Sequence, residues 1–282
     1  MIRYAAPLPT LATTIQSLLF VPGNRPERFA KALASGADLV CIDLEDAVPA
    51  DAKIEARAAA MAVVDNPKFA VRINGLTTRE GLADLLAIAA APIRPALLLI
   101  PKVESPHEIV IARQILNDPA IGFIPLIESA KGLGLAQAIA EEAQVVMMMF
   151  GGADFAAELG VALAWESLLF ARSQLVMACA AAGVPAMDVP YIDLDNVDGL
   201  EVETQQAKAL GFAAKATIHP AQIETLHNVF RPSTASIAEA LEARAAFAAS
   251  GGDAVRFKGK MLEAPIMRRY EQVIAIGERI NA

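Results

Sequence analysis

The sequence predicts a closed (β/α)8 barrel, a TIM barrel, with a C-terminal helical appendage. Eight short apolar runs recur along the 282 residues, and each ends in a polar or Gly/Pro turn. Stretches with helical spacing separate these runs, and strand and helix alternating in this way are typical of a parallel barrel. The composition agrees, because 55% hydrophobic and only 5% aromatic residues suit Ala-rich helices packed on apolar parallel strands. The length is ordinary for one such barrel.

The expected strands lie where the apolar runs are rich in β-branched and large aliphatic residues. They span residues 17–21, 39–43, 69–73, 96–100, 122–127, 145–150, 189–194 and 212–218. A doubly wound open sheet is the alternative arrangement. No Gly-rich dinucleotide fingerprint follows the first run, so the closed barrel is favoured.

The first helix carries the clearest boundary signals. Asn24 is a candidate N-cap, Pro26 lies in the first turn, and Gly36 follows the last turn. The other helical segments span residues 53–64, 79–90, 105–116, 130–141, 166–182, 200–210 and 221–229.

We expect two structural parts, a catalytic barrel at residues 1–232 and a helical extension at residues 233–282. The extension is expected to hold a helix at 237–249, a turn at 250–252, a short stretch at 254–260 and a helix at 265–280. These segments suggest no core of their own. The extension should therefore pack on the barrel or on a neighbouring subunit.

The charge balance limits the classes of partner. The net charge is −8, and no Lys/Arg cluster of the kind that binds nucleic acid or a membrane surface is present in the sequence. Cys41 and Cys179 lie in apolar stretches and are expected to be reduced core residues. The first 16 residues lack an export signal pattern, and no apolar run of about 20 residues predicts a membrane span. These features predict a soluble cytoplasmic protein.

Charged side chains gather at the carboxyl ends of the predicted strands, where barrel enzymes carry their sites. They are Asp43, Glu45, Asp46, Arg72, Lys102, Glu128, Asp154, Asp193, Asp195 and His219. Two carboxylates about 4 Å apart repel by about 4 kcal/mol at an effective dielectric constant of 20, and a divalent cation would remove this cost. Oxygen ligands favour Mg²⁺, with Glu128 and Asp154 as the candidate pair. Helix capping or ion pairing is the alternative role for these acids.

The basic side chains leave alternatives open. Arg72 either has a structural role among the acids or binds a substrate carboxylate with its planar fork. A desolvated Lys102 or Lys215 could form a Schiff base with a carbonyl substrate, although the excess of acids favours an ion-paired Lys102. His219 directly precedes Pro220 and is either a cap or a base.

At these strand ends the sequence resembles the citrate lyase β-subunit/malyl-CoA lyase family, within the HpcH/HpaI aldolase superfamily. The matching segments are SLLFVPGN (17–24), IDLEDAV (42–48), VRING (71–75), LIPKVE (99–104), IESAKGL (127–133), FGGADF (150–155), IHPAQI (218–223) and KGKMLEAP (258–265). Because they run in order along almost the whole chain, the resemblance is specific to the family, and it is much less specific to a substrate.

The resemblance implies a Mg²⁺-dependent barrel, usually trimeric or hexameric, that cleaves citryl, malyl or citramalyl thioesters or runs the reverse condensation. By this resemblance Glu128 and Asp154 would hold Mg²⁺, and Arg72 would bind the carboxylate of the keto-acid portion. The other implied site residues are Phe20, Arg25 and Lys31 at the CoA moiety, the backbone around Ile218 and His219 along the acyl arm, and Glu45 and Asp46 near the metal water.

One departure from the family pattern concerns the proposed general acid. The family carries an aspartate in its C-terminal segment, delivered across a subunit interface, and this sequence has Glu263 at that position. The extra methylene would shift the carboxyl group by about 1 Å, enough to reduce the rate unless something compensates.

The predicted function is therefore Mg²⁺-dependent carbon–carbon lyase activity. The favoured substrates are citramalyl-CoA and malyl-CoA, cleaved by a retro-Claisen reaction to acetyl-CoA and a 2-keto acid. One alternative is the lyase (β) subunit of a citrate lyase complex, acting on a citryl group bound to a carrier protein. A Schiff-base aldolase and a non-catalytic CoA-binding barrel are the alternatives from other classes.

Overall fold

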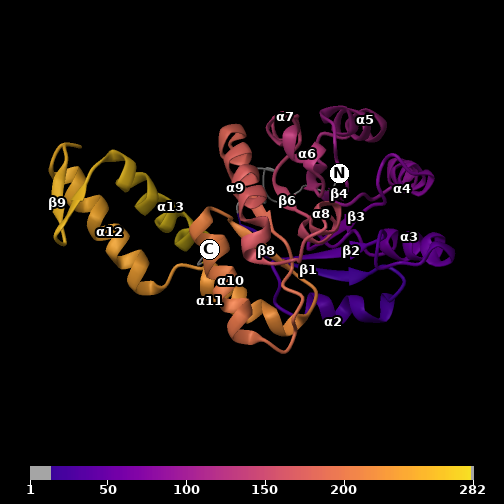
Figure 1. Ribbon diagram of the computed structural model, residues 1–282, viewed down its shortest axis with the longest axis horizontal. Coiled ribbons are helices and arrows are strands. Elements are labelled where there is room, and N and C mark those ends of the chain that lie inside the picture. The colour runs from indigo at the N-terminus through magenta and orange to yellow at the C-terminus, as the bar shows by residue number, and fades with distance from the viewer. Residues whose placement is uncertain (1–13, 281–282) are drawn as a thin grey trace. The chain divides into compact units, whose positions relative to one another are not determined.

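The computed structural model describes residues 14–280, which divide into two compact units at the Leu226–His227 boundary. The first unit is a closed barrel of parallel strands in sequential order (Figure 1). The strands are β1 (Ser17–Pro22), β2 (Leu39–Asp43), β3 (Phe69–Arg72), β4 (Leu97–Ile100), β5 (Gly122–Ile127), β6 (Met148–Phe150), β7 (Ala186–Asp188) and β8 (Ala214–Thr217). Residues of β1 pair with β8, as in Ser17 with Lys215, and this closure confirms the predicted barrel over the open sheet.

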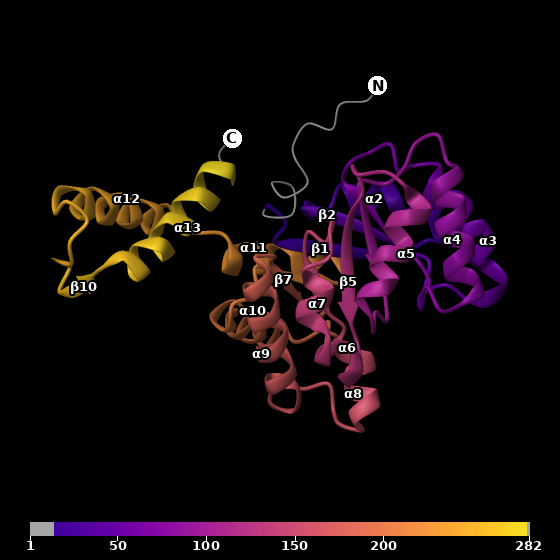
Figure 2. The same ribbon diagram turned by 90° about the horizontal axis from the view of Figure 1, so that it is seen from above.

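Helices surround the barrel, and Figure 2 shows α3, α4 and α5 lying outside the strands. The helical elements of this unit are η1 (Pro26–Arg28), α2 (Phe29–Leu33), η2 (Ala50–Ala52), α3 (Lys53–Met61), α4 (Arg79–Ala90), α5 (Pro106–Leu116), α6 (Ala130–Gly134), α7 (Ala136–Ala140), α8 (Gly152–Leu159), α9 (Trp165–Ala182), α10 (Val197–Leu210), η3 (Pro220–Gln222) and α11 (Ile223–Phe230), which crosses the unit boundary. Within residues 14–280, none of the helices is both long enough and apolar enough to cross a bilayer.

Local capping explains several helix starts. The side chains of Thr78, Ser105 and Ser129 accept hydrogen bonds from backbone N–H groups in the first turns of α4, α5 and α6. Two helix predictions are wrong. Asn24 caps nothing, because the helical turn begins two residues later without a side-chain cap, and the segment predicted as one helix at 130–141 is split into α6 and α7.

Alternate residues of each strand face two different cores. In β2, Leu39 and Cys41 belong to the core inside the barrel, whereas Val40 and Ile42 pack between the strands and the helices. This alternation follows from the two-residue period of a strand. It also determines which side chains at the strand ends can point into the barrel mouth.

The seventh strand is not where the sequence predicted it. The structure places β7 at Ala186–Asp188, and the predicted segment 189–194 is loop. Pro190 within that segment cannot donate a ladder hydrogen bond, which argues against a strand there. Asp193 and Asp195 are therefore exposed loop residues rather than strand-end residues.

The second unit is a helical pair with a small hairpin. It contains α12 (Thr234–Ala249), β9 (Val255–Phe257), β10 (Lys260–Leu262) and α13 (Ala264–Ile280). Ala243, Leu262 and Met267 are buried together, and Phe257 and Tyr270 pack edge to face beside them. The expectation that this extension has no core of its own is wrong. Its packing on the barrel or on a neighbouring subunit stays a prediction.

Candidate active site

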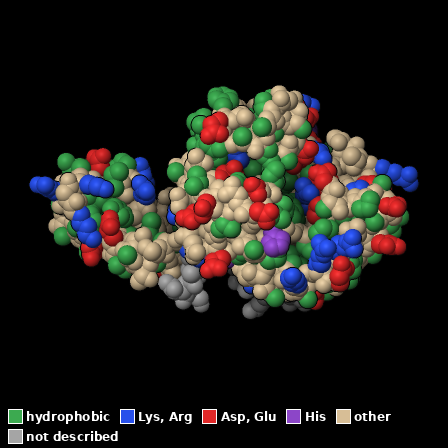
Figure 3. Space-filling model, turned by 60° about the horizontal axis from the view of Figure 1, so that its bottom comes forward, with side chains coloured by type: hydrophobic (Ala, Val, Ile, Leu, Met, Phe, Trp, Pro, Cys, Tyr) green, Lys and Arg blue, Asp and Glu red, His purple; other side chains and the backbone are tan. Residues whose placement is uncertain are grey.

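A cavity of about 540 Å³ opens at the carboxyl ends of the barrel strands. Figure 3 shows one face of the protein, on which acidic and basic side chains are intermixed. The polar residues that line the cavity are Arg28, Asp43, Asp46, Arg72, Glu128 and Asp154. The apolar lining includes Phe20, Leu126, Met149, Leu163, Val189, Pro190, Ile192 and Ile218. We call the polar lining residues the polar floor and the apolar lining residues the apolar wall of this cavity.

Arg72, the last residue of β3, points into the barrel mouth. Its Nε and Nη2 donate to the two carboxylate oxygens of Asp43 at 2.6 and 2.7 Å, and its Nη1 lies 3.1 Å from Glu45 Oε2. The guanidinium also lies 4.9 Å from the centre of the Phe20 ring. A guanidinium has five N–H groups, and two of them donate to Asp43, so Arg72 keeps donors for a ligand.

Asp43 was predicted as one of the strand-end acids but was given no individual role. Burial alone would raise the pKa of Asp43, but the hydrogen bonds and charge of Arg72 outweigh burial and hold that pKa below its ordinary value. Asp43 also accepts from the backbone N–H groups of Glu45 and Ala47. It therefore orients Arg72 and the segment that follows β2 together. The two-residue period of β2, which places Asp43 on the same inward face as Leu39 and Cys41, is the signal that could have indicated this role.

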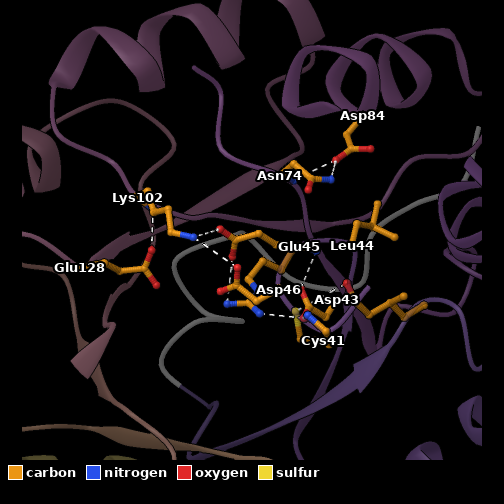
Figure 4. Close-up of polar contacts among 12 residues, drawn as sticks. Cys41, Asp43, Leu44, Glu45, Asp46, Asn74, Asp84, Lys102 and Glu128 are labelled. Carbon is orange, nitrogen blue, oxygen red and sulfur yellow. Dashed lines mark hydrogen bonds and ion pairs between the residues drawn. The ribbon is translucent and has the colours of Figure 1, made fainter. Parts of the chain in front are cut away.

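Lys102 connects acids that follow two strands, β2 and β6, and Figure 4 shows its contacts with the acids after β2. Its Nζ lies 2.7 Å from Glu45 Oε1, 3.3 Å from Asp46 Oδ1 and 3.8 Å from Asp154 Oδ2. Burial would lower the pKa of Lys102, yet the hydrogen bond and charge of Glu45 outweigh it and raise that pKa above its ordinary value. Lys102 is therefore a charged ion-pair partner and a poor nucleophile.

Glu128 is a buried carboxylate at the end of β5. One of its oxygens accepts from the backbone N–H of Lys102 at 2.8 Å, a residue whose φ of 54° lies in the left-handed region. Burial, followed by the negative charge of Glu45, raises the pKa of Glu128 to about 8. A Cβ on Gly151 would overlap the Glu128 side chain, so only glycine leaves room for this carboxylate.

These residues fit a divalent cation. Glu128 is a buried acid that lacks a sufficient counter-charge, and the half-exposed Asp154 in the first turn of α8 lines the same cavity. Over the described part of the chain, no three His, Cys, Asp or Glu side chains cluster as a metal site. Mg²⁺ commonly takes one or two protein carboxylates and completes its shell with water and substrate oxygens. Glu128 and Asp154 are the side chains that would hold it.

A second charged cluster lies beside β7 and β8, away from the polar floor. Lys215 Nζ donates to Asp188 Oδ2 at 2.6 Å, to Glu203 Oε1 at 2.8 Å and to the Val189 carbonyl at 2.7 Å. Arg172 Nε donates to the other oxygen of Asp188 at 2.9 Å. Lys215 is completely buried in these contacts, which leaves it no free amine for a Schiff base.

Several expected site residues lie elsewhere. His219 is exposed, and its Nδ1 accepts from the Ala221 N–H, so it caps η3. Arg25 and Lys31 are exposed near α2 and do not line the cavity. Glu263 is exposed in the second unit, directly before α13. The CoA roles of Arg25 and Lys31 and the acid role of Glu263 stay predictions.

Comparison with known proteins identifies the family. Residues 16–220 match the HpcH/HpaI aldolase/citrate lyase family. The chain belongs to this family. Human mitochondrial citramalyl-CoA lyase is 31% identical over 294 aligned residues, which cover 94% of this chain and 86% of that enzyme.

Two solved structures are similar to this chain over most of its length. RipC from Yersinia pestis is 40% identical, with a TM-score of 0.73 and coverage of 80% of this chain and 99% of RipC. CitE from Mycobacterium tuberculosis, solved with magnesium, acetoacetate and coenzyme A, is 33% identical, with a TM-score of 0.78 and coverage of 94% of this chain and 99% of CitE. The family resemblance predicted from the strand-end motifs is confirmed.

Further residues of this HpcH/HpaI family member, in and behind the cavity, were not predicted from the sequence. Arg28 of η1 lines the cavity. Lys53, the first residue of α3, donates to the backbone after β2, and Asn74 joins it to the buried Asp84. A signal for Lys53 was available, because a positive charge in the first turn of a helix opposes the helix dipole and needs a tertiary reason.

Proposed function

We propose that this chain is a Mg²⁺-dependent carbon–carbon lyase that cleaves citramalyl-CoA or malyl-CoA to acetyl-CoA and a 2-keto acid. The observation that carries the proposal is that Arg72, Glu128 and Asp154 line one cavity. A fork that binds carboxylate beside a pair of oxygen ligands suits a substrate with a carboxylate next to its hydroxyl. A citramalyl-CoA lyase among the relatives, and CitE solved with magnesium and coenzyme A, support the reaction class and the cofactor.

Arg72 would bind the substrate carboxylate through N–H groups that do not donate to Asp43. Asp43 holds the guanidinium at two atoms, so the fork is already oriented before substrate arrives. Mg²⁺, when bound, supplies positive charge that lowers the pKa of the substrate hydroxyl and favours cleavage of the adjacent carbon–carbon bond. Phe20 packs against Arg72 and would separate it from solvent.

Glu45 and Asp46 would act beside the metal water. Lys102 Nζ lies 2.7 Å from Glu45 and 3.3 Å from Asp46, and these contacts hold both carboxylates at the barrel mouth. Their oxygens can accept hydrogen bonds from water, a role that fits residues next to a hydrated cation.

Residues outside the polar floor would bind the thioester and supply the final proton. Arg25 and Lys31 would contact the CoA moiety, and the backbone around Ile218 and His219 would line the acyl arm. Glu263 of a second copy would protonate the thioester enolate, which requires a homo-oligomer such as a trimer or hexamer. The oligomer and the cytoplasmic location are predictions that extend the proposal.

The apolar wall bears on the choice of substrate. Leu126, Met149, Val189 and Pro190 line the cavity without a hydrogen-bond partner for a second carboxylate among their side chains. A methyl substituent, as in citramalyl-CoA, would bury apolar surface there, whereas the carboxymethyl group of a citryl thioester would lose hydration. The wall therefore favours citramalyl-CoA, and a citryl group on a carrier protein is the second possibility.

The ion pairs of Lys102 and Lys215 argue against a Schiff-base aldolase, because carboxylate partners hold both amines. A non-catalytic CoA-binding barrel would not need the strained charge balance around Glu128.

The test is keto-acid release from citramalyl-CoA and malyl-CoA by chelator-treated protein, with and without added Mg²⁺. We expect release that depends on Mg²⁺, faster with citramalyl-CoA, and absent from Asp154→Ala at an unchanged melting temperature. Release without Mg²⁺, or full activity of folded Asp154→Ala, would overturn the proposal. A borohydride-trapped adduct would instead indicate Schiff-base chemistry.

A further inference from the structure

Lys53 holds the backbone of the segment that carries Glu45 and Asp46. Its Nζ donates to the Leu44 carbonyl at 2.9 Å, to the Glu45 carbonyl at 2.9 Å and to Asn74 Oδ1 at 2.6 Å. Lys53 is half-buried at the start of α3, where its charge opposes the helix dipole. These three contacts are the compensation for that unfavourable position.

The segment after β2 is irregular and is held from two sides. Asp43 accepts from the N–H groups of Glu45 and Ala47, so it fixes the amide side. Lys53 donates to the carbonyls of Leu44 and Glu45, so it fixes the carbonyl side. A backbone segment anchored only through its amides would keep freedom to rotate, and its carboxylates would turn with it.

The position of Lys53 is itself fixed by a buried pair (Figure 4). Asn74, just after β3, donates its N–H and its Nδ2 to Asp84 Oδ2 at 2.8 and 2.6 Å, which directs its Oδ1 to Lys53. Asp84 lies in the interior of α4 with no exposed surface, and its other oxygen accepts from Arg57 Nε at 2.5 Å. An aspartate is unfavourable inside a helix, and a buried charge is costly unless it is paired. The contacts of Asp84 with Asn74 and Arg57 therefore explain its presence in α4.

We propose that Lys53, held by Asn74 and Asp84, is a positioning residue that aims Glu45 and Asp46 at the polar floor. Lys53, Asn74 and Asp84 do not line the cavity, so they act through the backbone of the 44–46 segment. The inference rests on the proposed function, because Glu45 and Asp46 would act on the bound Mg²⁺. It assigns to α3 and α4 a part in the site that the cavity lining does not reveal.

The experiment measures Mg²⁺ binding to the full-length protein by titration calorimetry. Lys53→Met keeps the length of the side chain and removes its three donors. We expect its Mg²⁺ Kd to rise about 10- to 100-fold, the range found when groups around a metal's ligands are removed, with unchanged binding stoichiometry. The stoichiometry reports the folded fraction, so a loss of structure alone would lower it without changing the Kd.

Two further variants sharpen the result. Lys68→Met removes an exposed lysine that directly precedes β3, at the end of that strand away from the barrel mouth, and should bind Mg²⁺ like the wild type. Lys53→Arg should recover part of the lost affinity because it restores donors. Asn74→Ala should also weaken Mg²⁺ binding, and the double variant with Lys53→Met should be little worse than either single variant, because contacting residues are not additive.

A folded Lys53→Met protein whose Mg²⁺ Kd stays within twofold of the wild-type value overturns the inference, as do fully additive effects of the two substitutions. Failure of the wild-type protein itself to bind Mg²⁺ or to release keto acid overturns the proposed function instead. The two failures are therefore distinguishable from the wild-type measurements.

Discussion

Two charged clusters in the same barrel differ in how completely their charges are balanced. The mouth cluster lines and borders the cavity and consists of Asp43, Glu45, Asp46, Arg72, Lys102, Glu128 and Asp154. The buried cluster beside β7 and β8 consists of Arg172, Asp188, Glu203 and Lys215. The first has five acids for two bases, whereas the second has two of each. The side chain of Lys102 is 46% exposed, and that of Lys215 is fully buried.

This difference separates a functional arrangement from a structural one. In the buried cluster the lysine has three acceptors and the pKa of Asp188 is low, since burial is outweighed by Lys215 and Arg172. In the mouth cluster Glu128 keeps a pKa of about 8 because burial and Glu45 disfavour its charge. An unbalanced buried acid beside a cavity is a place where a cation would gain binding energy, and a balanced network is not.

The largest expected effect comes from removing a charge in the mouth cluster. Glu128→Gln should lower Mg²⁺-dependent keto-acid release by about three orders of magnitude, comparable to losing a preorganised electrostatic group. The melting temperature should not fall, because glutamine keeps the size of the side chain and cannot take up the charge that burial and Glu45 disfavour. Steady-state kinetics and a thermal scan check this, and near-normal turnover would remove Glu128 from the metal site.

The next effect is on stability and belongs to the buried cluster. Lys215→Met should lower the free energy of unfolding by about 3–5 kcal/mol, because it leaves Asp188 and Glu203 without their partner. Lys102→Met should cost less than about 1 kcal/mol, as expected for a half-exposed ion pair. Urea unfolding of both variants measures the contrast, and equal losses would mean that the clusters do not differ in this way.

The pH dependence of stability should distinguish the clusters in the metal-free protein. A Glu128 pKa of about 8, raised from 4.5, means that the folded state binds the proton more tightly. This contribution is complete below pH 4.5 and is lost as the pH rises to about 8, at no more than about 1.4 kcal/mol per pH unit. The low pKa of Asp188 contributes stability that is complete above its ordinary pKa of 3.8 and is lost only as the pH falls below that value.

The measurement is urea unfolding of wild type and Glu128→Gln between pH 5 and pH 8 in chelator. The wild type should become less stable relative to Glu128→Gln as the pH rises. A difference independent of pH would contradict the raised pKa.

The smallest effect is expected outside both clusters. Asp195→Asn changes an exposed loop acid that the incorrect strand assignment had placed at the barrel mouth. Its unfolding free energy should change by no more than about 0.5 kcal/mol, and its turnover by less than twofold. A large loss of activity would show that the loop after β7 reaches the substrate.

Much of the mouth cluster could be predicted, because the two-residue period of a strand and the end of each apolar run indicate which side chains lie at the barrel mouth. Glu128 ends an apolar run, and Arg72 ends the run before Asn74, so their place at the barrel mouth follows from local sequence. The seventh strand was missed because its polar residue, Asp188, is buried in an ion pair that no local pattern reveals.

The sequence by itself determined the barrel, its mouth and the family, because these depend on periodicity and on residues adjacent along the chain. Only the tertiary structure decided which charges pair. Lys102 meets Glu45 across 57 positions, and Lys53 meets Asn74 across 21. Such partners are brought together by barrel closure and helix packing, and the free energy of each charge depends on that arrangement rather than on its sequence neighbours.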